Sequence, residues 1–209
     1  MFHVKHLRMT DRLVDNVSRE TTLRLEAFSA LLLRWNRTIN LISKADEPQL
    51  RIRHIGDSLA LIPALPPMFS NAIDLGSGAG FPGLVLAIAT GRPFALVEAD
   101  QRKAAFLREA ARVTQAPVTV LAQRIETLKI VRSPVLTARA LAPLSVLLPW
   151  IAALITADGV AILPKGRTAE AELTQVAGEW QMRVERFPST NAGSTILKLS
   201  EITRVGRAP

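Results

Sequence analysis

The sequence has 209 residues, of which 48% are hydrophobic, so it is long and apolar enough for one large domain with a full core. It contains no cysteine, which excludes disulfides, thiolate metal sites and cysteine nucleophiles and fits a reducing, cytoplasmic location. Its three histidines are scattered, so we expect no catalytic metal. The formal net charge of +8 predicts an anionic partner, most simply a nucleic acid. Met1–His6 lack the apolar segment of a signal peptide, and we expect a monomer without a membrane anchor.

The first third of the chain has the apolar spacing of helices. This pattern extends from about Thr10 to Leu65, with breaks near Ser43–Pro48 and at Pro63, and it predicts two or three helices. We therefore divide the chain into an N-terminal helical extension or cap over residues 1–66 and a main domain over residues 67–209.

A glycine-rich stretch follows this extension, and the rest of the chain is organised around it. A short apolar strand over Ala72–Leu75 leads into the closely spaced glycines Gly76, Gly78 and Gly80, and a helix follows to Thr90. Glycine tolerates positive φ and lets a ligand approach the backbone, and a helix start offers free N–H groups. This pattern predicts a loop that cradles a nucleotide-like ligand.

Two ligand classes fit this loop. Gly78–Gly83 has the G-x-G-x-x-G spacing of dinucleotide folds, and a nicotinamide-dependent oxidoreductase is therefore an alternative. The frame Asp74–Gly80, an acid followed by G-x-G-x-G, fits better and resembles motif I of the class I methyltransferases. Glu98 ends the next apolar run and is placed to accept hydrogen bonds from ribose hydroxyls in either class.

Predicted strands and helices alternate after residue 70. The strands are expected over Ala72–Leu75, Phe94–Glu98, Val118–Ala122, Val135–Arg139, Val160–Pro164, Gln181–Phe187 and Thr195–Ser200. The helices are expected over Pro82–Thr90, Arg102–Val113, Pro143–Ile155 and Ala169–Gly178. This order predicts an α/β fold, a Rossmann-like, mostly parallel sheet with helices on both faces that ends in an antiparallel hairpin. The apolar run Leu141–Leu163 is interrupted by prolines and an Asp-Gly pair, so it divides into helix, turn and strand and does not span a membrane.

His54, Asp57 and Ser58 stand close together just before the glycine motif. A Ser-His-Asp hydrolase is disfavoured, because residues within one turn do not readily adopt triad geometry. A polar patch beside the mouth of the site is the better interpretation.

Six blocks carry a family resemblance. In chain order they are Trp35–Ser43, His54–Leu59, Asp74–Gly83, Gln123–Glu126, Ala138–Ala140 and Pro164–Gly166. Together they resemble the RsmG (GidB) family of bacterial small-subunit rRNA methyltransferases, over most of the chain from Leu23 to Lys198. The resemblance implies a class I S-adenosylmethionine-dependent fold and methylation of N7 of one guanine in the 530 loop of 16S rRNA. Its partner would be 16S rRNA or the small ribosomal subunit.

The resemblance also implies roles for individual residues. The cofactor-binding residues would be Gly76, Ser77, Gly78, Phe81, Glu98, Ile125, Glu126 and Arg139. Of these, Glu98 would hold the ribose, and Ile125 with Glu126 would flank the adenine. The substrate-binding residues would be His54, Asp57, Arg124 and Lys165, and Arg139 would also be the catalytic residue.

Guanine N7 already carries an in-plane lone pair, so its methylation needs positioning but neither a general base nor a metal. Arg139 stands where exocyclic-nitrogen methyltransferases carry an acid. We interpret it as a phosphate or carboxylate binder or as a donor to guanine O6, with a structural ion pair as the alternative. Two alternatives for the whole protein are a methyltransferase for another RNA position or a small molecule, and a non-catalytic rRNA-binding assembly factor.

Overall fold

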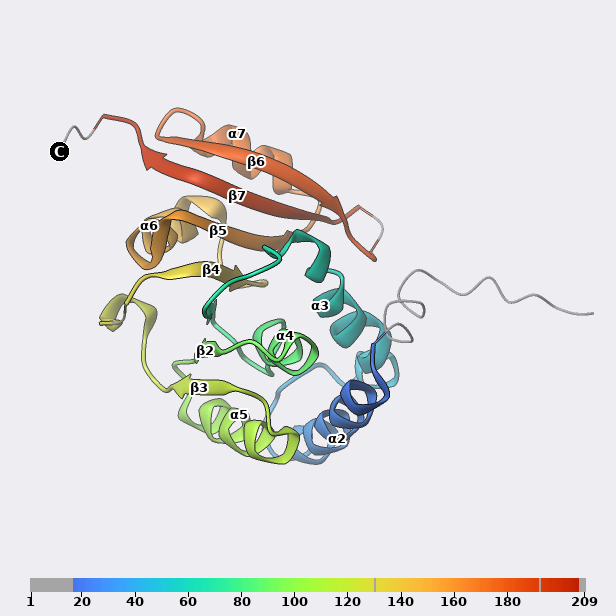
Figure 1. Ribbon diagram of the computed structural model, residues 1–209. Coiled ribbons are helices and arrows are strands. Elements are labelled where there is room, and N and C mark those ends of the chain that lie inside the picture. Colours follow the sequence, from blue (N-terminus) through green and yellow to red (C-terminus); the bar gives the residue numbers. More distant parts are fainter. Residues whose placement is uncertain (1–16, 130, 192, 207–209) are drawn as a thin grey trace, which may run out of the picture.

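A computed structural model describes residues 17–129, 131–191 and 193–206 (Figure 1). Residues 1–16, with the first part of the predicted extension and Met1–His6, lie outside the described residues. The described α-helices are α2 (Arg19–Asn36), α3 (Asp57–Leu59), α4 (Gly83–Thr90), α5 (Gln101–Thr114), α6 (Leu144–Leu154) and α7 (Ala169–Val176). The strands are β1 (Ala72–Leu75), β2 (Phe94–Val97), β3 (Val118–Leu121), β4 (Ser133–Ala138), β5 (Ile155–Lys165), β6 (Trp180–Pro188) and β7 (Thr195–Arg204).

In the described part of the chain, the strands form one seven-stranded sheet in the order β3-β2-β1-β4-β5-β7-β6. Strands β1 to β5 pair in parallel, whereas β7 is antiparallel to both β5 and β6. The predicted parallel sheet with a terminal antiparallel hairpin is confirmed. The order reverses between β1 and β4, and in such sheets the crevice beyond the strand ends at this point is where ligands bind.

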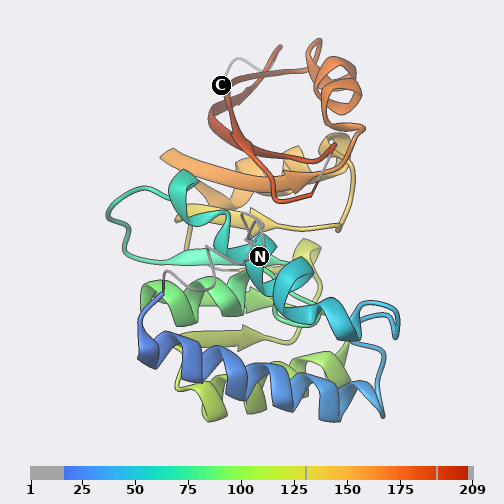
Figure 2. The same cartoon turned by 90° about the vertical axis from the view of Figure 1, so that its right-hand side faces the viewer.

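The two faces of the sheet bury separate apolar clusters. Helices α2, α4 and α5 contribute to the cluster on one face, together with residues of the segment after α2. Helices α6 and α7 cover the other face. Figures 1 and 2 show α2 lying against α5, outside the layer that packs on the sheet. Side chains alternate along β1, so that Ala72 belongs to the first cluster and Ile73 and Leu75 to the second.

Helix α2 is capped at its N-terminus and bound to the main fold near that end. Ser18 caps it, because its Oγ accepts a hydrogen bond from the Thr21 N–H at 3.1 Å. Arg24 donates to the carbonyl oxygens of Thr114 and Gln115, where α5 ends and its carbonyl dipoles favour a cation. The buried side chains of α2 share one apolar cluster with α4 and α5. The division at residue 66 stays a prediction.

The segment between α2 and β1 is less regular than the expected helices. The break near Ser43–Pro48 is present, and a π-helical turn over Leu50–Gly56 then leads into α3. Pro63 lies inside a 3₁₀ turn over Ile62–Ala64, so the α-helical path ends before the proline and not at it. Wide π-helical turns often occur at functional sites, and this one carries His54.

The apolar run Leu141–Leu163 divides into a helix and a strand as the sequence predicts, but the predicted turn between them is absent, and Asp158 and Gly159 lie inside the strand. It forms α6, which ends at Leu154, and most of β5, which begins at the next residue. Among the described residues, we find no helix with the length and apolar character needed to cross a membrane.

The close approach of α4 to β1 depends on Gly83. A Cβ at this position would lie 2.5 Å from the Asp74 Cβ and 2.6 Å from the Leu96 Cδ2. We expect Gly83→Ala to lower the free energy of unfolding by about 1–3 kcal/mol, as overpacking does in a tight core. Gly178→Ala is the control, because no atom lies within 4 Å of its added methyl group. Urea denaturation measures both, and equal stability of the two variants would contradict the tight packing.

Candidate active site

The glycine loop between β1 and α4 needs its glycines for conformational reasons. The φ angles are +65° at Gly76, +54° at Gly78 and +92° at Gly80, in the left-handed region that side chains disfavour. Gly78 is also open, since the nearest atom to an added Cβ is the Gly76 carbonyl oxygen at 3.8 Å. A ligand can therefore lie directly on the backbone at this point.

Glu98 is positioned against this loop from the end of β2. Its Oε2 accepts a hydrogen bond from the Gly78 N–H at 2.8 Å, and its Oε1 accepts one from the Asp100 N–H at 2.8 Å. The residue is only 9% exposed. Each carboxylate oxygen retains a further lone pair, so Glu98 remains able to accept hydrogen bonds from a diol.

A cavity of about 380 Å³ lies over this part of the sheet edge. It brings together six of the predicted residues: Gly76, Gly78, Glu98, Arg124, Ile125 and Glu126. Arg124 forms an exposed ion pair with Glu126, with an Nε–Oε2 distance of 3.4 Å. Ser77 and Phe81 are buried at 1% and 5% exposure and do not line the cavity. They support the loop from beneath, and the Ser77 Oγ donates to the Asp74 carbonyl oxygen at 3.1 Å.

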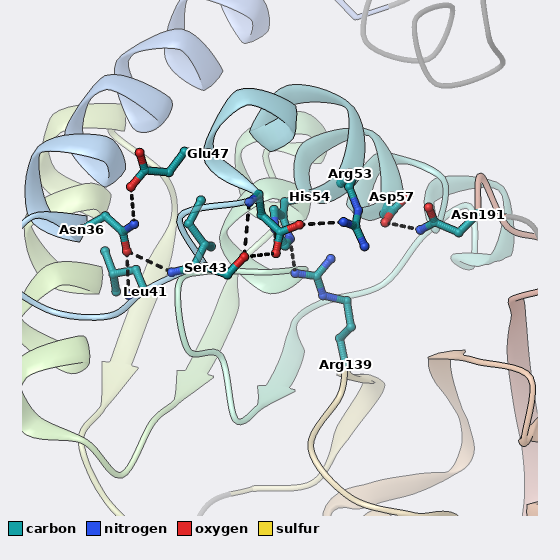
Figure 3. Close-up of polar contacts among 11 residues, drawn as sticks. Asn36, Leu41, Ser43, Glu47, Arg53, His54, Asp57, Arg139 and Asn191 are labelled. Atoms are coloured by element: carbon teal, nitrogen blue, oxygen red, sulfur yellow. Dashed lines mark hydrogen bonds and ion pairs between the residues drawn. The ribbon is translucent and has the colours of Figure 1, made fainter.

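Arg139 follows directly after β4 and is partly buried. Its Nη2 lies 3.0 Å from the His54 Nδ1 (Figure 3), and its guanidinium carbon lies 5.1 Å from the centre of the Phe81 ring. The His54 ring stacks on Phe81, with ring centres 5.0 Å apart. Burial lowers the pKa of Arg139, although Asp57, Asp74 and Asp46 oppose this. The guanidinium remains protonated at neutral pH.

The contact with Arg139 determines the tautomer of the His54 ring. A guanidinium only donates hydrogen bonds, so Nδ1 must accept and the neutral ring carries its proton on Nε2. Burial, together with the charges of Arg139 and Arg53, lowers the pKa of His54 to about 4, against the opposing effect of Asp46. The Nε2 faces the Asp46 Oδ2 at 3.9 Å. His54 is therefore neutral at physiological pH and orients Arg139.

Asp57 and Ser58 point to different partners. The Asp57 carboxylate accepts hydrogen bonds from the Thr190 hydroxyl and from the Asn191 Nδ2, the latter at 2.6 Å, in the β6–β7 loop. Ser58 is fully buried, and its Oγ donates to the His54 carbonyl oxygen at 2.7 Å. No Ser-His-Asp triad forms from these three residues.

A second cavity of about 470 Å³ lies beyond the ends of β4 and β5. It is lined by the predicted residues Asp57, Arg139 and Lys165 and by residues of the β6–β7 loop. Leu141 lines both cavities, so they lie next to each other at this residue. Methyl transfer between a cofactor and a base needs two contiguous sites of this kind.

Lys165 has an internal partner. Its Nζ lies 2.8 Å from the Glu172 Oε2 and donates to the Ala142 carbonyl oxygen at 2.9 Å. Burial would raise the pKa of Glu172, but hydrogen bonds from Lys165, the Leu144 N–H and Thr168 outweigh it and lower the pKa. In this structure Lys165 therefore links the segment after β4 to α7 at the edge of the second cavity.

Sequence reasoning missed several residues of the site. Asp46 binds Arg53 at 2.7 Å and faces His54, and Asn191 binds Asp57. Leu141 and Trp150 line the first cavity. The sequence could have indicated Asp46 as a site residue, because it closely follows the Trp35–Ser43 block that carries the family resemblance. Asn36 in that block donates to Glu47 and accepts from the N–H groups of Leu41 and Ile42 (Figure 3).

The strand order, the antiparallel β7 and the glycine loop define a class I S-adenosylmethionine-dependent methyltransferase fold. The structure is similar to cofactor-bound Rv0187 from MTB, with a TM-score of 0.58, 13% identity and coverage of 88% of this chain and 90% of that one. It is also similar to MtNAS in complex with S-adenosylmethionine, with a TM-score of 0.57, 18% identity and coverage of 86% and 72%.

The family model described as rRNA small subunit methyltransferase G (GidB) matches residues 22–197. The ribosomal RNA small subunit methyltransferase G of Granulibacter bethesdensis is 54% identical over 213 residues, which cover 98% of this chain and 100% of that protein. The chain therefore belongs to the rRNA small subunit methyltransferase G family, and the resemblance seen in the sequence is confirmed.

A buried carboxyl lies beneath the site. Asp74 is fully buried in β1, and its Oδ1 accepts a hydrogen bond from the Thr137 Oγ1 at 2.6 Å. Its Oδ2 is packed against Gly83 without a hydrogen bond of normal geometry. Burial raises the pKa of Asp74 to about 6 and outweighs the hydrogen bonds that lower it.

This raised pKa predicts a pH-dependent stability. The Asp74 carboxyl binds its proton more tightly in the folded protein than in the unfolded chain. The stability that this protonation contributes is therefore fully present below about pH 4 and is lost as the pH rises through 6. Asp74→Asn removes this titration. We expect the stability of the variant relative to wild type to rise by about 3 kcal/mol between pH 4 and pH 8. Urea unfolding across this range measures the difference, with Asp158→Asn, an exposed site, as the control. A pH-independent difference would contradict the raised pKa.

Proposed function

We propose that this protein transfers a methyl group from S-adenosylmethionine to N7 of a guanine in the 530 loop of 16S rRNA. One observation carries the proposal. A nucleoside-type cavity with an acidic residue lies next to a second cavity bounded by Arg139, and Leu141 lines both. The name of the Granulibacter relative supports small-subunit rRNA as the substrate, and the sequence resemblance supplies the guanine and its N7.

The first cavity fits S-adenosylmethionine. The open backbone at Gly78 admits the ligand, and the Glu98 carboxylate is placed for the ribose hydroxyls. Ile125 and Glu126 line the part of the cavity proposed for the adenine. When bound, the cofactor supplies an electrophilic sulfonium methyl group.

The chain holds the base in place without activating it. N7 carries its lone pair in the neutral base, so no group needs to remove a proton before the methyl transfer. Arg139 is a permanent donor, and His54 is neutral with its Nδ1 engaged by that donor. Both are suited to positioning a base, and neither is needed to deprotonate one.

The remaining partner and location assignments follow from this reaction. Unmethylated 16S rRNA or a small subunit is the proposed partner, and the cytoplasm, where subunits assemble, is the proposed location. Arg124 is exposed at the mouth of the first cavity and is a proposed contact for RNA phosphate. The monomeric state and the lack of a metal stay predictions.

The test is a methyl-transfer assay. The full chain is incubated with methyl-labelled S-adenosylmethionine and either unmethylated small subunits or naked 16S rRNA, and the labelled nucleoside is identified after digestion. Label in 7-methylguanosine is expected. Label in another nucleoside would overturn the target, and cofactor and RNA binding without label would favour an assembly factor.

Arg139 is expected to act mainly on the reaction. We expect Arg139→Ala to lower the methyl-transfer rate by about 100-fold, because a preorganised donor is lost from the site. Arg183→Ala, which removes an exposed arginine from the outer strand β6, should leave the rate unchanged. Single-turnover rates and thermal unfolding together measure the effect. Normal turnover of Arg139→Ala would remove this residue from the site.

Gly78→Asp tests the cofactor cavity. The new carboxylate would enter the cavity beside Glu98, so we expect the affinity for S-adenosylmethionine to fall by about 100-fold, or about 3 kcal/mol. Gly91→Asp is a matched control, because Gly91 also has a positive φ of +66° and open surroundings but lies beyond the end of α4. Calorimetric titration measures both variants. Equal affinity in the two would contradict the placement of the cofactor.

A further inference from the structure

Besides the paired Lys165 and Glu172, the second cavity is lined by two opposite charges from separate segments. Arg139 reaches it from the end of β4, and Asp57 reaches it from the start of α3. Among the carboxylates that favour the charged form of Arg139, Asp57 has the largest effect. A guanidinium donor beside a carboxylate acceptor is a pattern that can be matched to the edge of a base.

We propose that Arg139 and Asp57 read the Watson–Crick edge of the target guanine, with Arg139 donating to O6 and the Asp57 carboxylate accepting from N1–H and the N2 amino group. This assignment rests on the proposed function, because it places the guanine that receives the methyl group in the second cavity. It makes Asp57 a specificity-determining residue.

The order of the groups in the structure matches the order of atoms on guanine. Around the base, N7 is followed by O6, then N1–H, then the N2 amino group. In the protein, Leu141 follows Arg139 by two residues and packs against Gly76 of the glycine loop, whereas Asp57 lies on the Asn191 side of His54 (Figure 3). A base whose O6 meets Arg139 and whose N1 meets Asp57 therefore turns its N7 toward the cofactor side.

Adenine has the reverse pattern at the same edge. Its N6 amino group would face the donor Arg139, and its N1 lone pair would face the Asp57 carboxylate. Both contacts would be unfavourable, and such unpaired buried groups are an effective means of rejecting a wrong base. The pair thus selects guanine by repulsion as well as by attraction.

The Asp57 carboxylate is held in place for this role. The Thr190 hydroxyl and the Asn191 amide each donate to one of its oxygens. A carboxylate oxygen accepts two hydrogen bonds, so one site on each oxygen remains for guanine. Thr190 and Asn191 are positioning residues in this arrangement, and they connect the β6–β7 loop to the base.

The carboxylate also favours the transition state. Methylation at N7 makes the base cationic, and the N1–H of a cationic guanine is a stronger acid than that of neutral guanine. Its hydrogen bond to Asp57 therefore strengthens as the methyl group is transferred, which is the kind of differential interaction that raises kcat. A purely structural role for Asp57 would not produce this dependence on the base.

The test combines a protein variant with a change in the base. Small subunits are reconstituted with 16S rRNA that carries guanine or inosine at the methylated position, and inosine lacks only the N2 amino group. We expect wild type to methylate the inosine substrate about tenfold more slowly in single turnover, as expected for one lost hydrogen bond to a charged acceptor. Asp57→Asn should slow transfer to guanine by about tenfold or more and should no longer distinguish the two bases.

Asp158→Asn is the matched control, since it makes the same chemical change at an exposed site in β5. It should keep the wild-type rate and the preference for guanine. Thermal unfolding and affinity for S-adenosylmethionine establish that Asp57→Asn is folded and binds the cofactor. A guanine preference that persists in Asp57→Asn, or wild-type enzyme that methylates inosine at the guanine rate, would overturn the assignment. If wild type forms no 7-methylguanosine on guanine-containing subunits, the proposed function itself fails.

Discussion

The contact between Arg139 and its two aromatic neighbours joins three parts of the chain that are distant in sequence. Arg139 comes from the end of β4, Phe81 from the glycine loop and His54 from the π-helical turn before α3. Phe81 also packs edge-on against Phe28 of α2. The residue proposed to hold the substrate therefore takes its position from the glycine loop and from the N-terminal segment together. A shift of any one of the three would move the guanidinium.

Two ionisable groups at the site, the buried Asp74 and the partly buried His54, affect stability in opposite directions. Asp74 has a pKa raised to about 6, so its contribution is lost as the pH rises. His54 has a pKa lowered to about 4, so its contribution is present above about pH 6.5 and is lost as the pH falls toward 4. Between about pH 4 and pH 6, Asp74 makes the free energy of unfolding fall with rising pH, whereas His54 makes it rise. The wild-type protein can therefore have a flat stability profile although both groups are strongly perturbed.

Local pattern predicted the sheet, its antiparallel end and the part of the first cavity formed by the glycine loop and Glu98, because strand, glycine loop and acid follow one another in sequence. The family resemblance supplied Arg124, Ile125 and Glu126. Pattern could not show that Ser77 and Phe81 lie beneath the loop, since the burial of Phe81 depends on packing against α2 and the π-helical turn. Nor could it show the internal partner of Lys165, which lies on α7. Asn191 was missed because its contact with Asp57 spans 134 positions and follows no periodicity.

The charges at the site suit a nucleophile that needs no activation. A site for an exocyclic amine benefits from an acceptor beside the reacting nitrogen, to take its proton, whereas guanine N7 has none to lose. A cation at the end of β4 is tolerable only if it does not face the atom that becomes positive. The proposed contacts, with Arg139 at O6 and Asp57 beyond it, satisfy this condition, because they place the carboxylate on the side of the base where the proton becomes more acidic. In the opposite arrangement, a carboxylate next to N7 would itself be a nucleophile and would compete with the N7 lone pair for the methyl group.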